Sequence, residues 1–539
     1  MCSEQRHFYV ACTVLAVFVA LLAPTAFAQK TANPVTIVTA ADAGETERFA
    51  AAELAKYLAK MGNPQPKIVK APAQGEVYLG VLPGSVAPSE RRLYEDPIAG
   101  RDPDSFLIRS FARGVVIKGN SPRAVLFGTY HYLESLGARW YFPGTENELI
   151  PQVAVRLTGF DTVQVPSFRK RGIVVFASTP GFASLVDFAA KVKLNTIGLH
   201  DTSKEYDAYS LASKAIGARG LTIDAERHLF GERFCPDDTA ALATEKERFK
   251  SYIATLPSQL NDFFLWVADK ELPPCASPKY RNYSVSDLVM YFSNEIAQTL
   301  RRTRPQGRYA YLAYLGTEPP PKNVKPGPGV LLEWAPMRQC FAHSFDDPDC
   351  PMNRAYRQNI EGYLKLFKPE DAQVLGYWLD DTLFNRTGYG RLPYRPDVLK
   401  ADLTYLHKLR VPDVTTFGVI TGANYFASHV SPAVFLYPRL LWDVTSDPQS
   451  VMKEFCQGFF GDGDTLKVFD LLAEADRLVY VDKHQVQARM VNDPAFIAAV
   501  SEAIRLSQTF VTAQTDPRLR GRRAKLLQEV AERFSKTGK

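Results

Sequence analysis

The stretch "VLGYWLDDTLF", residues 374–384, reads as a buried strand that ends in two adjacent carboxylates, Asp380 and Asp381. Two like charges directly after an apolar run need a physical reason. A barrel of parallel strands supplies one, because the carboxyl ends of its strands meet around a shared pocket. The stretch therefore directs the search toward other apolar runs that end in polar residues.

Eight such runs occur between residue 169 and about residue 425, and segments with helical periodicity separate them. One of these segments, "SVSDLVMYFSNEIAQTL", begins with the capping box Ser284/Asp287. The pattern predicts a (β/α)8 barrel over residues 167–430. The eight predicted strands are "GIVVFA" (172–177), "NTIGLHD" (195–201), "GLTIDAE" (220–226), "FFLWVAD" (263–269), "YAYLAYLGTE" (309–318), "GVLLEWA" (329–335), "QVLGYWLDD" (373–381) and "TTFGVITG" (415–422).

Further domains are expected on both sides of the barrel, because roughly 510 mature residues exceed what one hydrophobic core usually serves. Residues 29–166 alternate strand patterns such as "PVTIVTA" with two amphipathic helices, which predicts a small open α/β domain. Residues 431–539 are mostly amphipathic helices, and we expect the basic last one to pack on the protein rather than bind a membrane or partner. The predicted fold class is α/β, with this accessory domain, the TIM barrel and a C-terminal helical region in that order.

The first 28 residues have the features of a signal peptide, an apolar core followed by Ala26-Phe27-Ala28. We therefore expect an exported protein, periplasmic or extracellular, without a membrane attachment after cleavage. The formal net charge of +6 is dispersed, and no run of Lys and Arg occurs. This distribution excludes nucleic acid as an expected partner.

Five cysteines remain after cleavage of the signal peptide, and none forms a C-x2-C pair. We therefore expect no metal site and no cofactor. In an oxidising compartment, two bridges are predicted, Cys235–Cys275 and Cys340–Cys350, with Cys456 left over. The alternative is that most of the five are free and buried.

Acidic residues at the predicted strand ends are the candidates for chemistry. Glycoside hydrolysis needs one carboxylic acid that protonates the leaving oxygen and a second group that attacks or activates water. The predicted catalytic residues are Asp269, Glu333, Asp380 and Asp381. Only one of Asp380 and Asp381 should face the barrel axis, because successive side chains of a strand point in opposite directions. A single carboxylate at such a position can instead cap a helix or pair with an arginine.

Aromatic and polar residues near the same strand ends are predicted to bind substrate, because aromatic rings offer flat apolar faces to sugars. These residues are His200, His228, Tyr314, Trp334, Tyr377 and Asn424. The two histidines lack the spacing of metal ligands, and a structural hydrogen bond is the competing interpretation for each.

Two N-terminal stretches, "FAAAELAKYLAKMG" and "GVVIKGNSPRAVLFGTYHYLESLGARWYFPG", resemble the accessory domain that precedes the catalytic barrel in bacterial alpha-glucuronidases and beta-hexosaminidases. The barrel, with "LAYLGTEPPP", "RQCFAHSFDDPDCPMN" and "LLWDVTSDPQSVMKEFCQGFFG", is similar to a largely uncharacterised family of secreted bacterial proteins that carry a domain of unknown function. The resemblance implies a general acid after strand four, at Asp269, and further acids at Glu333 and the Asp380/Asp381 pair. It also implies that Trp140, in the "RW" motif, stacks on a sugar.

These observations predict a secreted glycoside hydrolase-like protein that cleaves a poly- or oligosaccharide by Asp/Glu acid-base catalysis without a metal. Two alternatives are a non-catalytic carbohydrate-binding protein on a barrel scaffold and a polysaccharide lyase. The sugar, the linkage, the stereochemical outcome and the oligomeric state stay open at this point.

Overall fold

The protein is described by a computed structural model that covers residues 33–176, 181–200, 214–257, 260–380, 394–418, 432–478, 481–482, 485–486 and 493–535. The predicted signal peptide and the predicted site residues Asp381 and Asn424 lie outside these described residues. Among the described helices, none is both long enough and apolar enough to cross a membrane.

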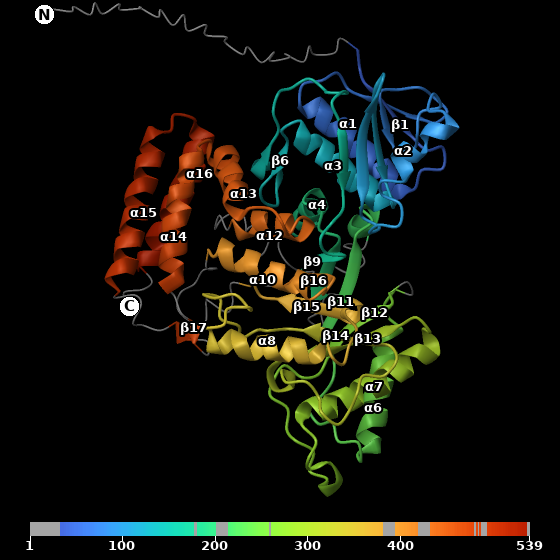
Figure 1. The fold of residues 1–539 in the computed structure, drawn as a ribbon, viewed down its shortest axis with the longest axis vertical. Helices are drawn as coiled ribbons and strands as arrows, with labels where there is room; N and C mark the ends of the chain where they lie inside the picture. The colour runs from blue at the N-terminus through green and yellow to red at the C-terminus, as the bar shows by residue number, and fades with distance from the viewer. Residues whose placement is uncertain are drawn as a thin grey trace, which may run out of the picture.

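The N-terminal part forms a six-stranded sheet covered by two helices, α1 (Glu45–Lys60) and α3 (Pro122–Ser135), as Figure 1 shows. Helix α3 begins as its sequence predicts, since the Ser121 side chain accepts a hydrogen bond from the Ala124 N–H (3.1 Å). The prediction missed strands β2 and β8, which lie at the two edges of the sheet and bury little apolar surface. In sheet order, the strands are β2 (Lys67–Lys70), β1 (Thr36–Thr39), β3 (Val77–Leu79), β5 (Gly114–Gly119), β4 (Phe106–Phe111) and β8 (Asp161–Gln164).

Eight parallel strands close into a barrel, and the predicted fold class is confirmed. Each strand overlaps one of the eight apolar runs, although β15 ends before Asp380 and β16 shares only Thr415 and Thr416 with its predicted run. Closure occurs where β16 pairs with β9 through Asp413↔Lys170 and Val414↔Arg171. The strands are β9 (Lys170–Phe176), β10 (Thr196–His200), β11 (Thr222–His228), β12 (Asp262–Trp266), β13 (Arg308–Ala313), β14 (Val330–Trp334), β15 (Ala372–Gly376) and β16 (Asp413–Thr416).

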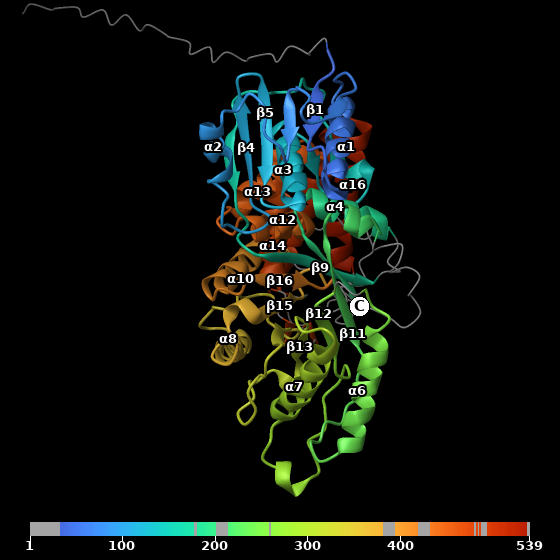
Figure 2. The same ribbon diagram turned by 90° about the vertical axis from the view of Figure 1, so that its right-hand side faces the viewer.

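Helices between the strands surround the barrel. Helix α7 has the predicted capping box, because the Ser284 N–H donates to Asp287 Oδ2 (2.9 Å) and the Asp287 N–H donates to Ser284 Oγ (3.1 Å). Helices α6 and α7 extend on the side away from the N-terminal sheet in both views of the molecule (Figures 1 and 2). The described barrel helices are α4 (Phe182–Lys191), α6 (Thr239–Ile253), α7 (Val285–Thr303), α8 (Pro351–Tyr363) and α10 (Pro396–Lys408).

The N-terminal end of the barrel is closed by ion pairs. Lys170 Nζ donates to Asp224 Oδ2 (2.8 Å) and to Gln373 Oε1 (2.7 Å) inside the barrel. Arg308 pairs with Asp262 beside them (2.6 Å). Charges at this end of such a barrel serve stability rather than chemistry, because ligands bind at the opposite end.

Two glutamates occupy the barrel interior above these ion pairs. Glu333 accepts hydrogen bonds from Gln373 Nε2 (3.1 Å) and from Trp266 Nε1 (2.6 Å). Glu226 is 0% exposed, and neither of its carboxyl oxygens has a hydrogen-bond partner among the described residues. Gly198 on β10 makes room for it, since a Cβ there would lie 2.4 Å from Glu226 Oε1. Burial raises the pKa of both carboxyl groups, and their proximity raises that of Glu226 further.

A buried ion pair joins the N-terminal sheet to the barrel. Asp104, which precedes β4, accepts from Arg171 Nη2 on β9 (2.7 Å), and both side chains are almost completely buried. Arg123 Nε and Asn195 Nδ2 also donate to the Asp104 carboxylate, at 2.7 and 2.8 Å. The Arg171 guanidinium lies 4.9 Å from the ring centre of Trp442, so a residue from the C-terminal region completes the junction.

The C-terminal region packs beside the N-terminal sheet as a group of helices (Figure 1). Arginines of its last helix donate to backbone carbonyls of buried segments, for example Arg522 Nη1 to Phe459 O (2.9 Å) and Arg518 Nη2 to Glu148 O (2.9 Å). The basic helix thus packs on the protein, as expected. The described helices of this region are α12 (Ala433–Trp442), α13 (Pro448–Phe455), α14 (Leu466–Leu478), α15 (Pro494–Ala513) and α16 (Pro517–Ser535).

One of the two predicted disulfides is present. Cys235 and Cys275 are bonded, which confirms that prediction. The predicted Cys340–Cys350 bridge is wrong for this structure, in which both residues are free thiols, and Cys456 is also free. Each of the two makes another contact instead, because Cys350 caps helix α8 and Cys340 Sγ lies 3.3 Å from His343 Nδ1.

Substituting Asp104→Asn should lower the free energy of unfolding by about 3 to 5 kcal/mol, because it leaves the buried Arg171 guanidinium without its counter-charge. Urea unfolding of the purified protein measures this change. The matched control is Asp161→Asn, which removes an exposed ion pair with Arg109 and should cost less than about 1 kcal/mol. Equal effects of the two substitutions would contradict the role of the buried pair.

Substituting Glu226→Gln should reduce the loss of stability at alkaline pH. The folded state holds the Glu226 proton more tightly than the unfolded chain does, so the free energy of unfolding falls as pH rises from the ordinary pKa of 4.5 through the raised folded pKa. The amide carries no such proton. The decrease in stability as pH rises above about 4.5 should therefore be smaller than in the parent protein. The exposed Glu247→Gln variant should retain the parental pH dependence.

Candidate active site

The ends of β10, β11 and β12 bring two histidines and a tryptophan together at the C-terminal mouth of the barrel. The His200 ring stacks on Trp266 with ring centres 5.6 Å apart and planes inclined by 29°. His228 lies 5.1 Å from the Trp266 ring and 6.0 Å from His200. In the strand register, all three side chains occupy positions on the same face of adjacent strands. Because side chains alternate between the two faces of a strand, all three point to the barrel axis.

His200 keeps an unused polar atom at this position. Its Nδ1 is buried and has no hydrogen-bond partner within the described part of the chain. Burial, together with the neighbouring His228, lowers the pKa of His200 to about 4, so the imidazole is neutral near pH 7. His228 differs, because its Nδ1 contacts the Val267 carbonyl at 2.5 Å. The competing interpretation, a structural hydrogen bond, therefore fits His228 better than His200.

Asp269 follows β12 on the exposed rim of the mouth. Its carboxylate accepts a hydrogen bond from the Tyr314 hydroxyl (2.9 Å), which comes from the end of β13. The charge of Asp269 also acts on the imidazole of His200 and partly opposes the lowering of its pKa. The structure thus brings together three residues that were predicted from separate strand ends, Asp269, Tyr314 and His200.

Strands β15 and β16 contribute the opposite side of the mouth. Tyr377, which follows β15, stacks on Phe417 with ring centres 5.5 Å apart and an interplanar angle of 3°. Phe417 in turn lies 5.7 Å from the His200 ring, so the two sides are in contact. Asp380 is 5% exposed three residues beyond Tyr377, and its charge acts on the Tyr377 hydroxyl.

Three predicted site residues lie elsewhere. Glu333 is 0% exposed beneath Trp266, so a direct contact with substrate is not supported. Trp334 has the opposite strand parity and packs outside the barrel against Phe345, with ring centres 4.9 Å apart. Trp140 is 2% exposed between Tyr57 and Tyr130 in the N-terminal domain, where it serves packing rather than sugar stacking.

Two residues at the mouth were not predicted, Trp266 and Phe417. The alternation in "FFLWVAD" carried the signal for Trp266, since it shares the inward face of the strand with Phe264. Phe417 directly follows β16, the last strand of the barrel, and forms a parallel bridge with Val174 on β9. Its ring contacts with His200 and Tyr377 place it at the mouth.

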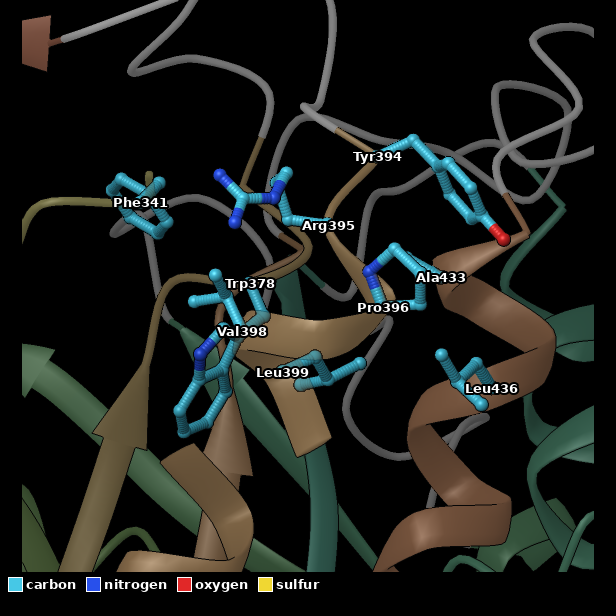
Figure 3. A pocket seen from close by; sticks show the side chains of 9 residues that line it. All are labelled: Phe341, Trp378, Tyr394, Arg395, Pro396, Val398, Leu399, Ala433 and Leu436. Carbon is cyan, nitrogen blue, oxygen red and sulfur yellow. The ribbon is translucent and has the colours of Figure 1, made fainter. Parts of the chain in front are cut away.

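A pocket opens beside this mouth, next to the start of α10 (Figure 3). The Arg395 guanidinium points toward Phe341 across the pocket, and it is held by the Ala342 carbonyl (2.7 Å) and by Asp397 (2.7 Å). None of the described residues that line this pocket carries a carboxylate. Its lining residues are Phe341, Trp378, Tyr394, Arg395, Pro396, Val398, Leu399, Ala433 and Leu436.

Comparison with protein families identifies one matching segment. The family described as "Domain of unknown function (DUF4838)" matches residues 271–469, which extend from the loop after β12 into α14. No curated protein matches the chain.

Comparison with solved structures identifies three glycoside hydrolase-type proteins that share the fold. A family GH115 4-O-methyl-alpha-glucuronidase with specificity for decorated arabinogalactans has a TM-score of 0.62 and 12% identity, over 94% of this chain and 72% of that protein. The protein CpGH84D has a TM-score of 0.52 and 9% identity, over 93% and 90% of the two chains. A GH138 enzyme targeting pectin rhamnogalacturonan II has a TM-score of 0.51 and 10% identity, over 93% and 69%. The predicted resemblance is therefore confirmed: residues 271–469 match a domain of unknown function, and the chain has a fold that glycoside hydrolases also use.

Proposed function

We propose that this protein is an exported glycoside hydrolase whose reaction takes place at the C-terminal mouth of the barrel. One observation carries the proposal. Strand ends that are distant in sequence bring the Asp269 carboxylate, the Tyr314 hydroxyl, the neutral His200 and the Trp266 ring to one place. Carboxylates next to aromatic rings are what sugar recognition and glycosidic cleavage need.

Asp269 is the proposed general acid. It is exposed on the rim, and the Tyr314 hydrogen bond fixes the orientation of its carboxyl group. In the proposed reaction, the Asp269 proton passes to the glycosidic oxygen as the bond from this oxygen to the anomeric carbon breaks. A carboxylate on the β15 side, Asp380 or Asp381, activates water or attacks the anomeric carbon.

Substrate orientation is assigned to the aromatic and imidazole groups. His200 Nδ1 is a buried polar atom without a described partner, and the proposal assigns a sugar hydroxyl to it, because such a contact would remove the cost of leaving it unpaired. The Tyr377 and Phe417 pair adds an apolar wall on the opposite side. Glu333 acts indirectly in this scheme, because its hydrogen bond with the indole N–H holds Trp266 under the site.

Export is part of the proposal and rests on two observations. The N-terminal segment has the composition of a signal peptide. The Cys235–Cys275 disulfide supports the same conclusion, because disulfides persist mainly in oxidising compartments.

Substituting Asp269→Asn or Asp380→Asn should lower the turnover number about 10²- to 10⁴-fold on a glycan that the parent protein cleaves, because each change removes a proton-transferring or charge-stabilising group. A glycan panel analysed by mass spectrometry identifies that glycan first. The matched control is Asp464→Asn in the C-terminal region, which is exposed and should keep full turnover. Thermal unfolding of all three variants verifies that they fold.

The outcomes separate hydrolysis from its alternatives. Products that absorb in the ultraviolet through a new double bond would indicate a polysaccharide lyase instead. Glycan binding without cleavage by the parent protein would indicate a carbohydrate-binding protein. Full turnover in both Asp269→Asn and Asp380→Asn would remove these two residues from the mechanism.

Substituting His200→Phe should raise KM about three- to tenfold with a smaller change in kcat, because it removes one hydrogen bond to the substrate and keeps an aromatic ring. Since the pKa of His200 is about 4, the effect should be constant across neutral pH. Steady-state kinetics over this range measures it. The control is His131→Phe on helix α3, and an equal change in KM there would contradict the assignment.

A further inference from the structure

The loop between β14 and α8 holds a cluster that the proposed reaction does not use. Cys340, His343 and Cys350 each direct one ligand atom to a common point, and these three atoms all lie within 4.8 Å of one another. Cys340 Sγ is 3.3 Å from His343 Nδ1. The two thiols are buried, and the imidazole is half-buried.

We propose that Cys340, His343 and Cys350 form a binding site for a thiophilic metal ion, Zn²⁺ in the first place. Zinc binds thiolate sulfur at about 2.3 Å and imidazole nitrogen at about 2.0 to 2.1 Å in tetrahedral geometry. Ligand atoms around one ion are then roughly 3.5 to 3.8 Å apart. The three ligand atoms lie within 4.8 Å of one another, about 1 Å above these separations at most, and the Cys340 Sγ to His343 Nδ1 distance is 3.3 Å. Zn²⁺ displaces two thiol protons to solvent, and water takes the fourth position.

Hydrogen bonds hold the backbone around the cluster in place. The buried Asn353 side chain accepts from the Cys340 N–H (2.8 Å) and donates to the carbonyls of Cys340 (2.9 Å) and His343 (2.7 Å). Cys350 caps the same helix, since its Sγ accepts from the Asn353 N–H (3.4 Å). One asparagine therefore ties both parts of the loop to the first turn of α8, which lowers the cost of assembling the ligands.

A disulfide between Cys340 and Cys350 is the competing use of these residues. The structure bonds Cys235 to Cys275 and leaves Cys340 and Cys350 as thiols, although their sulfur atoms are close. His343 Nδ1 lies 3.3 Å from Cys340 Sγ. This contact favours a metal site, because an imidazole can bind a metal ion but plays no part in a disulfide. The cluster was not predicted from the sequence, because Cys340-x2-His343 does not follow the C-x2-C pattern.

The site would hold the loop that forms one wall of the pocket beside the barrel mouth. Phe341, between two of the ligands in sequence, lines that pocket and also packs against the barrel interior. The Ala342 carbonyl holds Arg395 on the opposite wall. A metal at this position would therefore stabilise the pocket without contacting the proposed acids.

The test uses the purified mature chain, reduced, loaded with Zn²⁺ and desalted. Elemental analysis should find one equivalent of zinc per chain, and Co²⁺ in its place should give the intense visible bands of tetrahedral coordination and a thiolate charge-transfer band. His343→Asn and Cys350→Ser should each lose the stoichiometric metal. Cys456→Ala, which removes a buried free thiol outside the cluster, should retain it.

Thiol counting distinguishes the outcomes that overturn the proposal. In the unreduced, denatured chain, the thiol count could be two lower than the Cys235–Cys275 disulfide explains. That result without bound metal would establish a Cys340–Cys350 disulfide instead. Equal zinc content in the parent protein and in His343→Asn would show adventitious binding. Because His343→Asn leaves both buried cysteines in place, it keeps the test decisive even if Cys350→Ser does not fold.

Discussion

Closure of the barrel between β16 and β9 is the constraint on which the rest of the structure depends. The two strands come from opposite ends of the barrel segment, and their pairing through Asp413↔Lys170 and Val414↔Arg171 removes the last open edge. Closure also directs all eight carboxyl ends to one rim. Without it, Asp269 and Tyr377 would belong to unrelated parts of a sheet.

A column of polar contacts links the two ends of the barrel through its interior. Lys170 at the closed end bonds to Gln373, Gln373 bonds to Glu333, and Glu333 bonds to the indole of Trp266 at the mouth. A buried carboxyl group is expensive unless it is paired or protonated. Glu333 is hydrogen-bonded, and burial raises the pKa of Glu226, which favours its protonated form. These hydrogen bonds hold the Trp266 ring in place at the mouth from inside the barrel. Residues that do not contact a substrate therefore control the geometry of the proposed site.

The flanking domains are anchored on the first barrel strand. Arg171 of β9 lies between Asp104 of the N-terminal domain and Trp442 of α12, so three parts of the chain meet at one guanidinium. The adjacent Trp442 also packs on Phe106 of the N-terminal sheet, with ring centres 5.5 Å apart. The N-terminal domain therefore stabilises the closing strand, and its own tryptophan, Trp140, is used for internal packing.

The sequence by itself determined the local elements and their order. Apolar runs of strand length that end in polar residues identified all eight barrel strands, and side-chain caps such as Ser121 and Ser284 marked the helix starts. These features depend on neighbours in the chain, so a linear pattern records them. The short edge strands β2 and β8 escaped detection, because they bury little and leave no apolar signature.

Only the tertiary structure decided which strand-end residues share the mouth. Glu333 and Asp269 look equivalent in sequence, yet one lies inside the barrel beneath Trp266 and the other on the exposed rim. The difference depends on how far each strand extends past its neighbours, and no local pattern encodes that distance. The cluster of Cys340, His343 and Cys350 also depends on the tertiary structure. The loop that carries these residues folds against the first turn of α8, which brings their ligand atoms together.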